Sequence, residues 1–415
     1  MSRERDEFTF VAMRRLLFWD DFSALTPRIS GDERRVAVVS GTAHALHDGY
    51  TDLVYIMLPI WQAEFGLSYA ALGLLRSVLV GAMAALQIPA GFAAEWYGSA
   101  IVLALGTALA GLGFCFAGMS AGFAMLLVAL LISGIGSSTQ HPVASALVAR
   151  AFAGPRSLKA LGTYNFTGDI GKMTLPATLS LMLLVMAWRP ALAILGCLGV
   201  VLAVVIYLVT PRFENETAHA KTKTQGAVER PHRRYAFPVL FSIGMIDTAT
   251  RMAFLLFLPF VLRNKGASEQ TIGLALTLVF AGGAAGKLAC TFIGARIGAV
   301  GTVWLTEGST AVGILALFPL PLIGALLLLP LIGVALNGTS SVLYGSVPEL
   351  VPPQWRARAL SIFYTGVIGS GAISPILFGR AGDALGVWRA LTMIAGFVLL
   401  TLPLSALLRG ALSRP

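Results

Sequence analysis

Charge is scarce in this sequence. Of its 415 residues only 12% are Asp, Glu, Lys or Arg, whereas 56% are hydrophobic. A soluble domain carries roughly a quarter charged residues, because its surface must present groups that water solvates. The composition therefore excludes an ordinary soluble globular protein and favours a chain whose surface faces lipid.

Cysteine and the short motifs of catalysis are also lacking. Cys115, Cys197 and Cys290 lie far apart in apolar runs, which excludes a disulfide framework and a cysteine-based metal site. A phosphate-binding loop needs Gly-Lys-Ser or Gly-Lys-Thr, but Lys172 is followed by Met and Lys287 by Leu. No His-Glu-x-x-His or Gly-x-Ser-x-Gly motif occurs. We therefore expect no enzymatic activity, no cofactor and no metal site.

Long apolar runs take the place of these features. A transmembrane helix needs about 20 mostly apolar residues, and twelve stretches meet this length when Gly, Pro and charge clusters are taken as breaks. The predicted spans are 36–60, 69–94, 100–118, 122–149, 158–186, 188–209, 236–262, 269–295, 300–319, 322–347, 357–380 and 387–409. They predict an all-α membrane protein with twelve transmembrane helices.

Basic residues are unevenly distributed around these spans. If the N-terminus lies in the cytoplasm, the cytoplasmic segments carry 21 Lys and Arg residues and the opposite segments carry five. Because cytoplasmic loops are enriched in Lys and Arg, we expect a multi-pass protein of the cell (inner) membrane with both termini in the cytoplasm. The net charge of +10 belongs to these flanks rather than to one basic face, which argues against a nucleic-acid partner.

The longest hydrophilic stretch lies between the sixth and seventh spans and divides the chain. This division predicts a cytoplasmic N-terminal tail, two six-helix halves joined by a cytoplasmic linker, and a short cytoplasmic C-terminal tail. The predicted bounds are 1–35, 36–210, 211–235, 236–409 and 410–415.

The two halves repeat each other at a nearly constant offset. Residues Leu58-Pro59, Gly66, Ser68, Gly73-Leu74 and Gly98 recur 200 positions later as Leu258-Pro259, Gly266, Ser268, Gly273-Leu274 and Gly298. Residues 167–172 (TGDIGK) recur 198 positions later as 365–370 (TGVIGS). Parallel six-helix repeats are a known plan of secondary transporters, which hold substrate near the middle of the membrane between the halves. The repeat predicts two pseudo-symmetric six-helix bundles.

Together these features resemble the major facilitator superfamily over about residues 36–409. That family has a Gly-x-x-x-Asp-x-x-Gly-Arg-Lys loop after its second helix; here Gly91, Glu95 and Gly98 match, and the basic residues are missing. The resemblance implies that these three residues form a conformational latch. Residues 62–69 (QAEFGLSY) and 141–145 (HPVAS) further resemble the fosmidomycin-resistance type of drug exporter. The resemblance implies the major facilitator fold, a small-molecule substrate and a monomer.

Ionisable residues inside the spans are the main candidates for function, because a charge in the hydrocarbon core costs at least ~2.5–3.5 kcal/mol on insertion scales. His44, Asp48 and Asp52 are spaced four apart in the first span and so share one helix face, with His47 beside them. A carboxylate beside imidazoles in a cavity of low dielectric can titrate near neutral pH. We predict that these four residues take part in proton coupling; the alternative is that they face water or a neighbouring helix.

The fifth and seventh spans each carry an acid and a base close in sequence. Asp169 and Lys172 are three residues apart, and Asp247 and Arg251 are four apart. We predict that both aspartates take part in proton coupling and that the two bases bind an anionic substrate. A local structural ion pair is the alternative for each.

Single charges and polar residues complete the candidates. Lys287 in the eighth span is a further substrate-binding candidate, whereas Arg76 in the second lies where its side chain can reach the membrane interface. Gln140, Asn165 and Tyr364 are polar positions that can contact substrate or bond to a neighbouring helix.

The hypothesis we favour from the sequence is a secondary active transporter that exports small organic molecules, anionic or drug-like, by proton antiport and alternating access. Proton-coupled uptake of an organic anion is the alternative within transport. A membrane-embedded sensor that has lost transport is the alternative from another class. The expected partners are the substrate, protons and the lipid bilayer.

Overall fold

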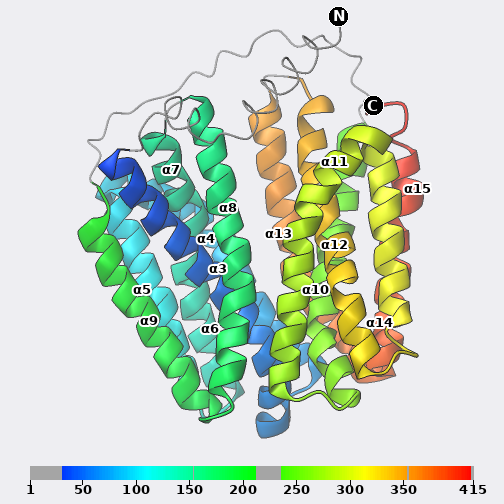
Figure 1. The fold of residues 1–415 in the computed structure, drawn as a ribbon, viewed down its shortest axis with the longest axis horizontal. Helices are drawn as coiled ribbons and strands as arrows, with labels where there is room; N and C mark the ends of the chain where they lie inside the picture. The colour runs from blue at the N-terminus through cyan, green and yellow to red at the C-terminus, as the bar shows by residue number, and fades with distance from the viewer. Residues whose placement is uncertain (1–29, 153, 212–234, 353–354, 413–415) are drawn as a thin grey trace, which may run out of the picture.

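The computed structural model describes residues 30–152, 154–211, 235–352 and 355–412, and within these ranges every regular element is helical (Figure 1). The helices are α3 (Gly31–Phe65), α4 (Tyr69–Tyr97), α5 (Ser99–Gly118), α6 (Phe123–Ser137), α7 (Ser145–Ala151), α8 (Pro155–Met182), α9 (Trp188–Val209), α10 (Ala236–Asn264), α11 (Glu269–Ala316), α12 (Leu322–Ser346), α13 (Arg356–Leu385), α14 (Val387–Leu399) and α15 (Thr401–Ala406). A π-helical segment, Gln140–Ala144, follows α6, and a 3-10 turn, Val347–Glu349, follows α12.

These elements make twelve crossings in the described part of the chain, as the sequence predicts. The segments α6 and α7 form one crossing around the π-helical segment, and α14 and α15 form another. Helix α11 is two helices joined at Gly298, whose φ of 75° and ψ of 170° are not helical. Ten of the crossings are long and apolar enough to span a membrane by composition alone. The other two, α3 and α8, are less apolar because they carry the candidate charged residues.

The start of α3 is fixed by a capping box. The Ser30 hydroxyl oxygen accepts a hydrogen bond from the Glu33 N–H (3.1 Å), and the Glu33 carboxylate accepts one from the Ser30 N–H (2.8 Å). The helix therefore begins five residues before the predicted span. Most of the predicted N-terminal tail, linker and C-terminal tail (1–29, 212–234 and 413–415) lies outside the described residues, so the predicted domain bounds stay a prediction.

The internal repeat is also visible in the backbone conformation of the turns and helix starts. Gly98 and Gly298, 200 positions apart, both turn the chain with positive φ, of 89° and 75°. Ser68 and Ser268 both cap a helix, because each hydroxyl accepts a hydrogen bond from the N–H three residues later. Equivalent turns in equivalent places support the pseudo-symmetry that the sequence predicts.

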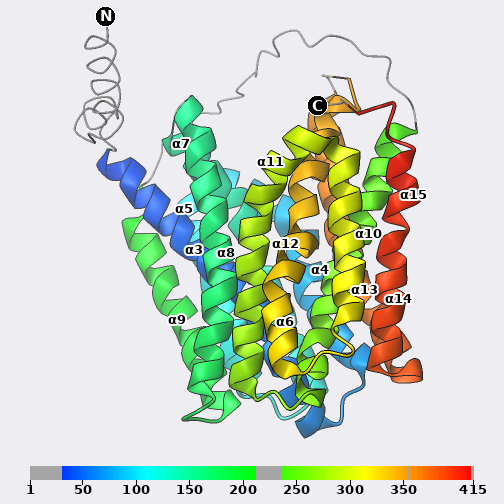
Figure 2. The ribbon, with the colours of Figure 1, turned by 45° about the vertical axis from the view of Figure 1, so that its right-hand side comes forward.

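The packing of the two groups of helices differs between the two ends of the molecule. Helices α3–α9 form one bundle and α10–α15 the other (Figures 1 and 2). A single hydrophobic core joins the bundles at one end, where residues such as Trp61 and Phe257 are fully buried. At the other end each bundle has a core of its own, around Val36 in one and Phe363 in the other.

This second end is the one at which α3 begins and α15 ends (Figure 1). The bundles therefore share a core at one end and have separate cores at the other.

Two pairs of helices hold the joined end together, α4 with α13 and α8 with α11. Gly73 on α4 lies so close to α13 that an added Cβ would come 2.2 Å from the Pro375 carbonyl oxygen. The side chain of Asp383, near the end of α13, accepts hydrogen bonds from the N–H groups of Tyr69 (2.6 Å) and Ala70 (3.0 Å). One half thus caps the first turn of a helix that belongs to the other.

Candidate functional site

A cavity of about 220 Å³ lies between the two halves. Its walls come from α3, α4, the π-helical segment and α8 on one side and from α10, α11, α12 and α13 on the other. Both halves therefore contribute to it, as expected for a site that changes its access when the halves move.

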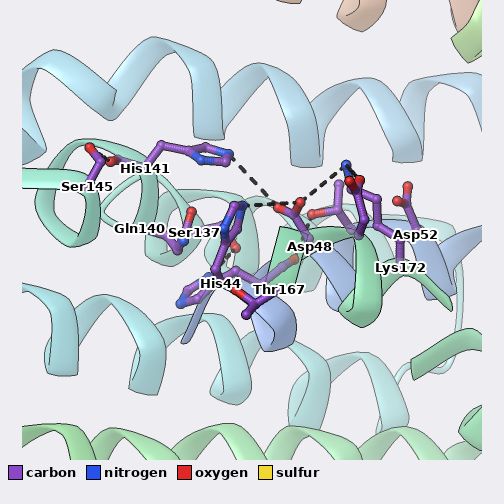
Figure 3. Close-up of polar contacts among 12 residues, drawn as sticks. His44, Asp48, Asp52, Ser137, Gln140, His141, Ser145, Thr167 and Lys172 are labelled. Carbon is purple, nitrogen blue, oxygen red and sulfur yellow. Dashed lines mark hydrogen bonds and ion pairs between the residues drawn. The ribbon is translucent and has the colours of Figure 1, made fainter. Parts of the chain in front are cut away.

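Asp48 is the centre of a charged cluster at this cavity (Figure 3). One carboxylate oxygen, Oδ2, lies 3.4 Å from His44 Nε2 and 3.2 Å from Lys172 Nζ. The other, Oδ1, lies 4.0 Å from His141 Nε2. His44 and Asp48 are one turn apart on α3, as their spacing predicts, whereas His141 comes from the π-helical segment. Its neighbour Pro142 has no N–H to donate within a helix, which fits a break in regular α-helix here.

Asp52, one turn further along α3, forms an ion pair with Arg76 of α4. The two side chains approach to 3.3 Å, and both residues are buried, with 5% and 2% of their surface exposed. The Arg76 guanidinium also lies 4.8 Å from the centre of the Tyr55 ring. The interpretation that Arg76 reaches the membrane interface is therefore wrong. Its nearest acid is on another helix, which spacing along the chain does not reveal.

An ion pair joins the two halves at Asp169 of α8. The Lys287 ammonium group of α11 donates hydrogen bonds to both Asp169 oxygens, at 2.6 and 2.8 Å. Lys172, the neighbour that the sequence suggests as its partner, is further away at 3.9 Å. Asp169 therefore connects the Asp48 cluster of one half to a cation of the other.

Arg251 of α10 lines the cavity without an ion pair to any described residue. Its guanidinium donates one hydrogen bond, to the side-chain oxygen of Asn337 (3.2 Å), and its buried Nε has no partner. The alternative interpretation, a local ion pair with Asp247, is not formed: no contact within 4 Å joins the two charged groups. Among the described residues that line the cavity, Arg251 is therefore a cation without a carboxylate partner.

Asp247 and His47, which are equivalent in the repeat, are buried outside the cavity lining. Glu307 of α11 is a second buried acid in the same half as Asp247. His47 bonds two hydroxyl groups, those of Ser137 (3.2 Å) and Thr107 (3.0 Å). Proton coupling through Asp247 and His47 stays a prediction.

The three polar candidates differ in position. Tyr364 lines the cavity next to Tyr344, with ring centres 5.7 Å apart. Gln140 is buried behind the lining and donates a hydrogen bond to the Tyr164 hydroxyl (2.7 Å). Asn165 is exposed and is not part of the cavity wall.

The predicted latch residues lie at the far end of α4. Gly91 and Glu95 are in its last turns, and Gly98 forms the turn into α5. Glu95 is exposed. The role of these residues as a latch stays a prediction.

Comparison with known proteins identifies the family. The model of the Major Facilitator Superfamily matches residues 41–246 and, a second time, 240–414. The chain belongs to this superfamily. Its fold is shared with a bacterial homologue of the human lysosomal transporter Spinster in an inward-facing, occupied conformation, with a TM-score of 0.76, 15% identity and coverage of 92% of this chain and 98% of that one. The predicted major facilitator fold is confirmed.

Three relatives of this chain have names that describe a substrate or a phenotype. A probable sulfoacetate transporter, SauU, of Cupriavidus necator is 26% identical, with 84% of this chain and 88% of the relative covered. The fosmidomycin resistance protein of Escherichia coli K12 is 23% identical over 82% and 84%, which bears out the predicted resemblance. A probable L-galactonate transporter of the same organism is 26% identical over 60% of this chain but only 57% of its own length.

Proposed function

We propose that this protein is a secondary active transporter that moves a small organic anion together with protons by alternating access. The observation that carries the proposal is Arg251: a cation on the cavity wall, placed between the halves, whose charge no described carboxylate pairs with. A guanidinium offers a carboxylate, sulfonate or phosphonate two parallel hydrogen bonds. An anionic substrate would supply the missing counter-charge.

The other cations of the site favour binding of proton and anion together. Arg76 is paired with Asp52, Lys172 with Asp48, and Lys287 with Asp169. A proton that neutralises one of these carboxylates frees its cation for the substrate, so that protonation promotes anion binding. In an antiporter, by contrast, proton and substrate must compete. The geometry therefore supports symport more than the antiport that we favoured from the sequence.

The names of two relatives fit this substrate class, since L-galactonate and sulfoacetate are organic anions. Export remains the second candidate, because a relative named for resistance to fosmidomycin fits removal of a drug. The distribution of basic residues supports an orientation in the inner membrane with both termini in the cytoplasm. The proposed transporter works as a monomer.

Binding to the purified protein in detergent tests the substrate class. We expect that one or more carboxylates or sulfonates from a panel bind measurably in calorimetry and that neutral analogues of the same size do not. Arg251→Met should weaken binding about 10- to 100-fold, because a hydrogen bond to a charged group contributes about 1.5–3 kcal/mol. Arg263→Met is the matched control, because Arg263 lies on the same helix but bonds the Pro59 carbonyl outside the cavity. Equal binding by neutral analogues, or no effect of Arg251→Met, would contradict the proposal.

A further inference from the structure

Three side chains with metal-binding groups converge at one edge of the cavity. We propose that His44, Asp48 and His141 bind a divalent transition-metal ion of the zinc type, with a fourth coordination position open to the cavity. One ligand atom from each residue lies within 4.8 Å of the other two (Figure 3). No motif in the sequence marks this group as a metal site, and His141 is far from the other two residues along the chain.

His44 is already held in the orientation of a metal ligand. Its Nδ1 lies 2.8 Å from the Tyr164 carbonyl oxygen, which can only accept, so Nδ1 carries the proton. The ring also stacks on Tyr164, with centres 4.3 Å apart. In the neutral ring, Nε2 therefore presents its lone pair to Asp48 Oδ2, 3.4 Å away. Two acceptors at this distance repel each other unless a proton or a metal ion lies between them, and a carbonyl on the outer nitrogen is the usual second partner of a ligating histidine.

The distances suit a zinc ion after a small movement of one residue. With bonds of 2.0–2.2 Å, two ligand atoms on a tetrahedral zinc ion are separated by about 3.4 Å. His44 and Asp48 already have this separation, whereas His141 Nε2 lies 4.0 Å from Asp48 Oδ1. The His141 side chain is 27% exposed and adjoins the cavity, so it has space to approach. Structural zinc sites have four protein ligands, whereas a site with three keeps its fourth position open to water or another small ligand.

Lys172 is the competitor for this site. Its ammonium group lies 3.2 Å from the Asp48 oxygen that faces His44, and a metal ion there would repel it. Lys172 has another acid within reach, since Asp169 lies 3.9 Å away. We therefore expect a metal ion and Lys172 to exclude each other at Asp48. If the proposed function holds, a bound ion also disturbs the ion pairs that join the halves and inhibits transport; metal binding itself does not depend on that function.

The chemical nature of the three ligands also determines which metal ions can bind. Two imidazoles with one carboxylate suit Zn²⁺, Co²⁺, Ni²⁺ and Cu²⁺, whereas Mg²⁺ and Ca²⁺ require more oxygen ligands. We expect the site to discriminate strongly against the latter two ions.

Titration of the full-length protein in detergent with Zn²⁺, against a chromophoric chelator, tests the proposal. We expect one equivalent to bind, His44→Ala or His141→Ala to weaken binding at least about tenfold, and Lys172→Met to tighten it. A purely structural role of Lys172 would not produce this tightening. Bound Co²⁺ should give the visible absorption of a four-coordinate ion. Thermal unfolding of each variant without metal verifies that it is folded.

The matched control is the double variant His219→Ala, His232→Ala, which removes the two histidines of the linker and leaves His44 and His141 in place. It should bind Zn²⁺ as the parent does. The proposal is overturned if folded His141→Ala protein binds Zn²⁺ like the parent, if the linker variant loses the binding, or if Mg²⁺ competes at equal concentration.

Discussion

At the scale of single residues, several of the charges inside this protein form pairs between helices. Arg76 and Asp52 belong to α4 and α3, and Lys287 and Asp169 to α11 and α8. An isolated charge in the hydrocarbon core is costly, and a partner with opposite charge removes much of that cost. The pairs therefore explain how the chain tolerates charges that its apolar composition would otherwise exclude.

The Asp52–Arg76 pair makes a prediction about stability. Removing one partner leaves a buried charge uncompensated, so Asp52→Asn and Arg76→Met should each destabilise the protein, by up to about 3–5 kcal/mol. The double variant should recover most of the loss, because neither charge remains. Thermal unfolding of the four proteins in the same detergent measures this. Single variants as stable as the parent would show that the ion pair is not formed.

Sequence alone identifies the residues of the site better than their partners. The four-residue spacing places His44, Asp48 and Asp52 on one face, because helix geometry is local. It assigns Arg76 to the interface, because the partner of Arg76, Asp52, lies on another helix. Contacts between helices depend on packing, which hydropathy and spacing along one helix do not contain.

At the scale of helices, the joined end is held by contacts that one half makes to the backbone of the other. The Asp383 carboxylate of α13 accepts hydrogen bonds from the backbone N–H groups of Tyr69 and Ala70 at the start of α4. Because the first N–H groups of a helix have no partner within it, this carboxylate satisfies donors that would face water if the halves separated there.

Removal of this cap should favour the state in which the joined end opens. A cap contributes about 1 kcal/mol, so Asp383→Ala should increase the population open at that end about fivefold. Distances between spin labels on α4 and α13 measure the change. Ser68→Ala is the matched control, since Ser68 caps the same helix from within its own half. An equal shift in both variants would contradict the proposed role of Asp383.

The crossing of α4 and α13 gives a second prediction for these helices. Gly73→Ala would place a Cβ 2.2 Å from the Pro375 carbonyl oxygen, so the helices must separate. We expect lower thermal stability or loss of the closed joined end. Gly81→Ala on the same helix is the control, because its nearest new contact is 4.0 Å away. A stable Gly73→Ala protein with unchanged label distances would show that the crossing is looser than described.

At the scale of the whole molecule, composition and repetition predict most of the architecture. Twelve apolar stretches of sufficient length become twelve crossings, because lipid demands helices whose backbone groups are all bonded. The repeated Gly98 and Gly298 become equivalent turns for the same local reason. Which end of the molecule has the shared core could not be predicted from the sequence, because it depends on how the two bundles pack against each other.

The central claim is that proton and anion move together. Proton flux in proteoliposomes with a pH-sensitive dye inside tests it most directly, using an anion found to bind. Addition of the anion outside should acidify the interior, and Asp169→Asn and Arg251→Met should abolish the signal. Arg263→Met should retain it, because Arg263 bonds the Pro59 carbonyl outside the cavity. Alkalinisation would instead indicate antiport, and anion entry without a change in pH would contradict coupling altogether.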